Sequence, residues 1–118
     1  MIRSAALALA LCSCLPSVTA FAHTDVVSTD PADGATLDAA PETLRVRFAA
    51  PLRVVKASVT RTAPDGARES RAERPAPAPS EELTLAPGLV GTGDYAIVWR
   101  ALGDDGHVVE GGFAFRVR

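Results

Sequence analysis

The chain has 118 residues, with 12 basic and 14 acidic side chains and a net charge of −2 at pH 7. Because the basic residues form no run in the sequence, nucleic acid is not expected as a partner. The length allows a single domain with one modest core, and no apolar stretch after residue 22 is long enough to cross a bilayer.

The first 22 residues have the features of an export signal. Arg3 gives a positive start, an apolar run follows over residues 5–15, and Ala20-Phe21-Ala22 places small residues at a cleavage position. The run is too short to span a membrane. We therefore expect residues 1–22 to be a signal peptide that is removed, and residues 23–118 to be the exported domain.

Two alternatives apply to this segment. One is an uncleaved anchor or a buried helix, which the short apolar run disfavours. The other is a lipoprotein, because Leu11-Cys12-Ser13-Cys14 loosely resembles a lipobox, and lipidation at Cys14 would leave His23 internal. Cleavage before His23 removes both cysteines and the only methionine, leaving 11 basic and 14 acidic residues and a net charge of −3. An internal disulfide is then impossible, so stability must come from burial.

Alternation of apolar and polar residues dominates the exported part. It is clearest over residues 44–48 and 113–117, which predicts half-buried strands. Residues 95–100 are apolar on both faces almost to their end, as expected for a more central strand. Weaker strand candidates are residues 54–62 and 82–85.

Turn sequences separate these segments, for example Pro64-Asp65-Gly66 and Asp104-Asp105-Gly106. Several short strands at this spacing, without helical periodicity, predict an all-β sandwich. The proline-rich residues 74–80 are expected to be a stiff surface loop or crossover. Tyr95 and Trp99 are expected in the core. Three arginines are expected on a solvated strand face: Arg100, Arg116 and Arg118.

The only two histidines, His23 and His107, occupy positions where a metal ion could use them. If His23 is the first residue, its α-amine and imidazole Nδ1 can chelate one metal ion. Asp105 and His107 are two residues apart in a predicted turn, so their side chains could converge on that ion, and Gly106 lets the backbone bend between them. Three nitrogens and one carboxylate oxygen suit Cu(II), and the exported part offers no sulfur ligand for Cu(I). Taken alone, Asp-Gly is ordinarily a hairpin turn, and a terminal histidine is ordinarily solvated.

The sequence also resembles the CopC copper-resistance family over essentially the whole exported part. The most specific features are the histidine at position 23, the turn Ser28-Thr29-Asp30-Pro31-Ala32-Asp33-Gly34, and Asp105-Gly106-His107 followed by Gly112-Phe113-Ala114-Phe115. Further matching segments are Ala40-Pro41, the strand ending at Phe48 and Pro51, and Gly93-Asp94-Tyr95 to Trp99-Arg100.

This resemblance implies an immunoglobulin-like Greek-key β-sandwich of about seven strands, located in the periplasm. It implies one Cu(II) per chain, bound by the terminal amine and by His23, Asp105 and His107. The implied role is that of a non-catalytic copper carrier or buffer in copper resistance, with an inner-membrane copper protein of the CopD type as a partner. Because no methionine follows residue 1, the chain resembles the members that have only the Cu(II) site. It departs from many members in having Ala50, rather than glutamate, before Pro51.

Two other classes of function compete with this interpretation. An amino-terminal histidine brace is also found in copper-dependent polysaccharide monooxygenases, but an aspartate in the copper plane would block oxygen chemistry there. Failure of the copper-loaded protein to oxidise ascorbate would argue against that class. The other class is a metal-free immunoglobulin-like interaction module, which would bind a partner through an edge strand. That class predicts that replacing His107 by alanine leaves copper binding unchanged.

Overall fold

The structure is a computed structural model that describes residues 26–75 and 78–118. Seven strands account for its regular structure: β1 (Val26–Asp30), β2 (Thr36–Leu37), β3 (Leu44–Thr62), β4 (Arg68–Glu73), β5 (Ser80–Leu85), β6 (Gly93–Leu102) and β7 (Val108–Val117). The described residues contain no helix capable of crossing a membrane. The all-β prediction of about seven strands is confirmed, although β1, β2 and β4 were not among the predicted segments. The predicted signal peptide lies outside the described residues.

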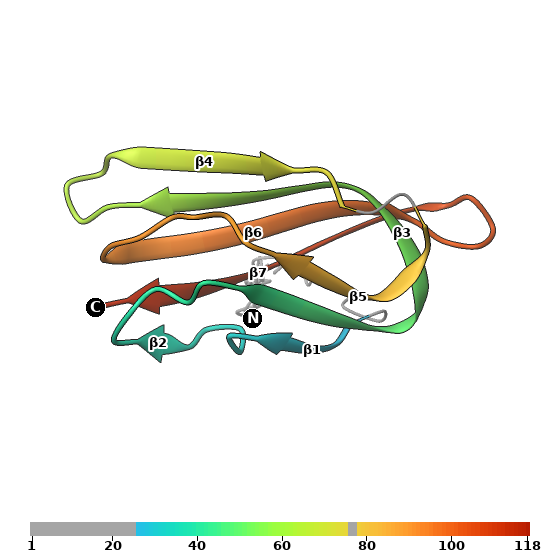
Figure 1. The fold of residues 1–118 in the computed structure, drawn as a ribbon, viewed down its shortest axis with the longest axis horizontal. Helices are drawn as coiled ribbons and strands as arrows, with labels where there is room; N and C mark the ends of the chain where they lie inside the picture. Colours follow the sequence, from blue (N-terminus) through green and yellow to red (C-terminus); the bar gives the residue numbers. More distant parts are fainter. Residues whose placement is uncertain (1–25, 76–77) are drawn as a thin grey trace, which may run out of the picture.

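Strand β3 joins the two layers of the fold (Figure 1). Its first half pairs with β1 and β5, and its second half pairs with β4 and β6. The pairing with β5 is irregular between Arg47 and Leu52, and the pairing with β6 is irregular between Val54 and Lys56. Such irregularities bend a strand. The sheet therefore curls through β3 into a first layer of β1, β3 and β5 and a second layer of β4, β3, β6, β7 and β2.

The two strands predicted over residues 44–48 and 54–62 are in fact one strand. Pro51, which suggested a strand end, lies within β3 between the two halves. A proline has no backbone N–H to donate to a neighbouring strand, so it is tolerated where the ladder is interrupted. Here that interruption is the bend, and the chain continues through it as a strand.

Apolar side chains from both layers form one core, and no polar or charged residue is buried among the described residues. The largest fully buried side chains are Leu44, Val46, Val59, Leu85 and Ile97. Aromatic contacts extend this core: Tyr95 stacks on Phe115 with ring centroids 4.8 Å apart, and Trp99 meets Phe48 edge-on at 5.9 Å. Tyr95 and Trp99 are each only 2% exposed, which confirms the prediction that they belong to the core.

Strand β6 is central, as predicted, because it lies between β3 and β7. Its two faces differ, however. Tyr95, Ile97 and Trp99 are buried, whereas Ala96 and Val98 are exposed. The second layer packs on the core with only one face, which is common for antiparallel sheets, so the apolar residues on the other face meet solvent.

The turn at Asp33 and Gly34 covers the outer edge of β7. The Asp33 carboxylate accepts a hydrogen bond from the Ala114 backbone N–H at 3.0 Å, and the Gly34 N–H donates to the Ala114 carbonyl at 2.7 Å. The following residues pair as β2 in parallel with the end of β7. This segment therefore occupies backbone groups of β7 that a free edge would leave unpaired.

Candidate metal centre

The predicted Asp-x-His motif lies in the turn between β6 and β7. These two strands pair without interruption from Gly93 opposite Val117 to Leu102 opposite Val108. The turn is closed by the Gly103 N–H, which donates to the His107 carbonyl at 3.0 Å. Gly106 has a φ of +78°, a conformation that side chains disfavour, which explains the glycine between the two candidate ligands. Figure 1 shows this turn projecting from the end of the molecule opposite the C-terminus.

The structure brings Asp105 and His107 into direct contact. One carboxylate oxygen of Asp105, Oδ1, accepts a hydrogen bond from the His107 backbone N–H at 3.0 Å. The other oxygen, Oδ2, lies 2.5 Å from Nδ1 of the imidazole. Both side chains remain accessible, with exposed fractions of 66% for Asp105 and 84% for His107. The carboxylate thus holds the His107 ring in place. The other ring nitrogen, Nε2 of His107, has no hydrogen-bond partner among the described residues.

The contact shifts both pKa values in the direction of an ion pair. The hydrogen bond from the His107 side chain, followed by the one from its backbone N–H, lowers the pKa of Asp105. In turn, the hydrogen bond to Asp105 and the attraction of its charge raise the pKa of His107. A metal ion that bound this imidazole would have to replace its proton, so protons would compete with it over a wider pH range than at an isolated histidine.

Replacing Asp105 by asparagine is expected to lower the pKa of His107 towards its ordinary value, because the negative charge that stabilises the imidazolium is lost. The change can be measured by following the His107 ring protons by NMR as a function of pH. Asp104→Asn is the matched control, since Asp104 lies in the same turn but forms no ion pair with a described residue. Equal pKa values in wild type and Asp105→Asn would contradict the observed contact.

Asp105 and His107 alone do not complete a metal site. Within residues 26–75 and 78–118, no group of three or more histidine, cysteine, aspartate or glutamate side chains is placed to hold a metal ion. The third predicted ligand residue, His23, lies outside the described residues. Ala50, which stands where many relatives were expected to have glutamate, is exposed in β3 and supplies no carboxylate.

The first described residues are nevertheless on the side of the molecule that carries the motif. Val26, which begins β1, pairs with Phe48, and the Phe48 ring contacts Trp99. Trp99 lies on β6, three residues before Leu102. Leu102 is the last residue of this strand, and the β6–β7 turn follows it. In Figure 1, β1 accordingly begins on the side that faces this turn.

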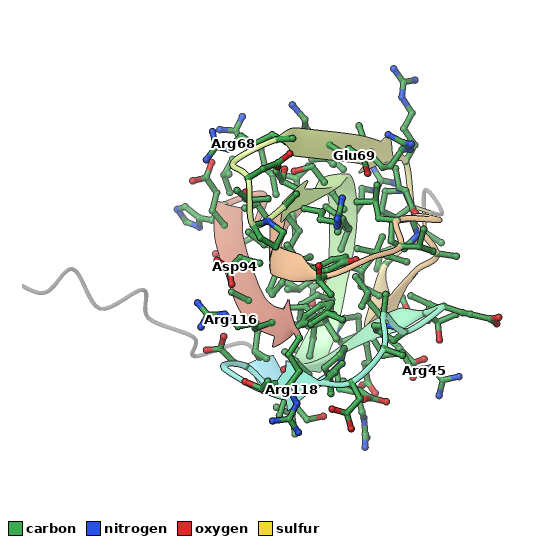
Figure 2. The ribbon with its side chains drawn as sticks, turned by 90° about the vertical axis from the view of Figure 1, so that its left-hand side faces the viewer. Arg45, Arg68, Glu69, Asp94, Arg116 and Arg118 are labelled. Carbon is green, nitrogen blue, oxygen red and sulfur yellow. The ribbon has the colours of Figure 1, made fainter. Side chains whose placement is uncertain are left out.

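The opposite end of the molecule is charged but contains no histidine among the described residues. Figure 2 shows Asp94 and Arg116 side by side there, and their side chains form an ion pair of 2.7 Å. Arg118 pairs with Asp38 at 2.8 Å, and Arg100, nearer the β6–β7 turn, pairs with Glu110 at 2.7 Å. All three arginines are exposed, Arg100 and Arg116 on strands as predicted and Arg118 directly after the end of β7. Exposed pairs of this kind contribute little to stability, about 0–1 kcal/mol each.

Together, the fold and the motif define a small β-sandwich with an exposed aspartate–histidine pair at one end. The chain belongs to the CopC domain family, whose sequence profile matches residues 26–118. No curated protein matches the chain. The family membership predicted from the sequence is therefore confirmed.

Solved structures of copper resistance proteins are similar over most of the chain. CopC from Methylosinus trichosporium OB3b is 29% identical, with a TM-score of 0.60, over 80% of this chain and 93% of that chain. PcoC from Escherichia coli, described as a copper resistance protein, is 25% identical, with a TM-score of 0.65, over 80% of this chain and 99% of that chain. A second PcoC structure, with a TM-score of 0.63 at 25% identity over 80% of this chain and 97% of that chain, is described as methionine-rich. The present chain has a single methionine, Met1.

Proposed function

We propose that this protein is a periplasmic Cu(II)-binding protein that carries or buffers copper in copper resistance and homeostasis. The observation that supports this proposal is the contact between Asp105 and His107 on an exposed turn, on the side of the molecule where β1 begins. Family membership and the similarity to copper resistance proteins support the choice of copper. The proposed site holds one Cu(II) per chain.

The remaining donors in this proposal come from His23, once residues 1–22 have been removed. Three residues separate His23 from Val26, the first residue of β1, and three residues of extended chain span about 10 Å. The terminal amine and the His23 imidazole would supply two nitrogens, His107 a third, and Asp105 a carboxylate oxygen. This donor set suits tetragonal Cu(II).

The chain's own residues suit carriage of copper better than catalysis. Asp105 and His107 already lie side by side, so both could turn to one metal ion through a local change, in which the imidazole nitrogen that binds would have to be free of its proton. With aspartate as the fourth donor in the plane, no position in that plane is left for a substrate or oxygen. We infer on this basis that the protein is not an enzyme. In the periplasm, a membrane protein of the CopD type would be a suitable partner for exchange.

Electron paramagnetic resonance of the processed protein, beginning at His23 and loaded with one equivalent of Cu(II), tests the site. We expect a tetragonal signal with coupling to about three nitrogens. Adding one glycine before His23 moves the terminal amine away from the imidazole and is expected to remove the amine nitrogen from the spectrum. The same extension leaves the β6–β7 turn unchanged and so isolates the contribution of the amine. Identical spectra for the two proteins would overturn the proposed ligand set.

A further inference from the structure

The exposed face of the second layer, next to the β6–β7 turn, is crossed by rows of paired side chains from β3, β6 and β7. Directly paired residues of antiparallel strands lie on the same face of a sheet. The row nearest the turn is Arg53, Leu102 and Val108, the next is Lys56, Arg100 and Glu110, and the third is Ser58, Val98 and Gly112. We call the part formed by Arg53, Lys56, Val98, Arg100, Val108 and Glu110 the basic face. It begins where the turn with the Asp105–His107 pair ends.

The basic face exposes apolar side chains that the fold does not cover. Val98 is 56% exposed and Val108 is 58% exposed. Val55, 43% exposed, lies next to Lys56 at the irregularity in β3. These are three of the five large apolar side chains that are exposed among the described residues. Val98 and Val108 flank the row of Arg100 and Glu110, so the face combines exposed apolar side chains with charged ones, as surfaces that bind a partner often do.

The charge of this face is opposite to that of the whole chain. Arg100 is neutralised by Glu110, whose Oε1 accepts hydrogen bonds from Nε at 3.0 Å and from a terminal guanidinium nitrogen at 2.7 Å. Arg53 and Lys56 form no ion pair with any described residue, so two positive charges remain uncompensated. The chain as a whole carries −2. An acidic surface is therefore attracted to this face and repelled by the average surface of the protein.

The face also contains a hollow in which a partner side chain can be held. Its volume is about 300 Å³, and it lies between the second and third rows, lined by Lys56, Ser58, Val98, Trp99, Arg100 and Glu110. The lining offers an ammonium group and a hydroxyl beside apolar surface. A carboxylate that enters the hollow would find Lys56 without a competing acidic group, because Glu110 is already bound to Arg100.

We propose that the basic face docks an acidic protein surface, in which carboxylates surround a small apolar side chain, and that this partner exchanges copper at the adjacent turn. The docking stands on the geometry of the face, whereas the exchange of copper rests on the proposed function. A lipid surface fits less well, since anionic membranes are typically bound by clusters of about four to eight Lys or Arg. The basic face has three cations with a carboxylate among them.

An NMR titration of the ¹⁵N-labelled processed protein with the peptide acetyl-Glu-Asp-Leu-Glu-Asp-amide tests the docking. We expect amide shifts confined to the parts of β3, β6 and β7 that form the basic face. Arg53→Glu combined with Lys56→Glu is expected to weaken peptide binding by about fivefold or more, and the neutral pair Arg53→Gln and Lys56→Gln by an intermediate amount. The matched control, Arg45→Glu with Arg47→Glu, makes the same charge change on the first layer and is expected to keep the wild-type affinity.

Equal weakening in the control pair, or shifts spread over the first layer, would overturn the docking site. Vesicles of phosphatidylcholine and phosphatidylglycerol in a 3:1 ratio form a second arm of the test. Binding to these vesicles through Arg53 and Lys56, without binding of the peptide, would identify a lipid surface instead of a protein.

The copper spectrum of the variant with Arg53→Glu and Lys56→Glu distinguishes failure of the docking proposal from failure of the proposed function. If wild type gave no spectrum of the proposed copper site, the proposed function alone would be overturned. If the charge-reversed pair kept the copper spectrum and bound the peptide as tightly as wild type, the docking site alone would be overturned.

Discussion

Copper affinity is expected to fall by more than about a hundredfold when His107 is replaced by alanine. Loss of a residue that only supports a metal ligand typically costs 10–100-fold in affinity, and loss of the ligand itself should exceed that range. In the proposed site, His107 supplies one of three nitrogens. Its removal also leaves Asp105 without the imidazole that now occupies Oδ2, so the carboxylate loses its fixed orientation.

Trp99 provides the readout for this prediction. It is the only tryptophan of the chain, it is 2% exposed, and it precedes the end of β6 by three residues, about 10 Å of strand. Paramagnetic Cu(II) bound at the turn should therefore quench its fluorescence, and competition with a chelator of known affinity then gives the dissociation constant. Asp104→Asn, in the same turn, serves as the control and should change the affinity by less than about threefold. Wild-type affinity in His107→Ala would instead favour the metal-free interaction module.

Replacing Gly93 by alanine is expected to destabilise the fold by about 3 kcal/mol or more. Gly93 has a φ of +137°, and an added Cβ would lie 2.2 Å from the Thr62 carbonyl oxygen. The residue begins β6 next to the end of β3, so this close approach belongs to the pairing of two central strands. Neither backbone can move away without loss of hydrogen bonds between β3 and β6.

Urea unfolding followed by circular dichroism measures this loss. Gly66→Ala is the matched control, because Gly66 also has a positive φ, of +89°, but an added Cβ there meets nothing within 4 Å. The control should lose only the cost of the backbone conformation, about 1–2 kcal/mol. If both variants lost the same free energy of unfolding, the close contact with Thr62 would contribute nothing.

The predictable part of the fold is the part where one strand face is buried and the other is not. Residues 44–48 and 113–117 alternate clearly and fall within β3 and β7. Strand β4 has the sequence Arg-Glu-Ser-Arg-Ala-Glu and is exposed along most of its length. An edge strand that buries almost no side chain shows no alternation of apolar and polar residues in its sequence. Strand β4 could therefore be identified only from its pairing with β3.

The residues in and beside the candidate site also differ in how well the sequence alone predicts their positions. The two-residue spacing of Asp105 and His107 is local, and it was sufficient to expect their side chains together. The basic face is not local, because its rows unite β3 with β6 and β7 through a register that depends on the irregularity next to Val55. Arg53 and Lys56 are unremarkable in the sequence, and only the register places them beside the turn. His23 stays a prediction from the sequence.

Strand β3 also has a consequence for how the protein folds. Each layer takes half of this one strand, and its partners are distant in the chain: Leu44 pairs with Leu85, and Thr62 with Asp94. Pairing over such separations requires closure of long loops, which costs conformational entropy before the strand contacts form. All-β domains of this kind fold in about milliseconds to seconds. Neither layer has a complete set of strands without β3. The two layers are therefore expected to form, and to be lost, in a single cooperative event.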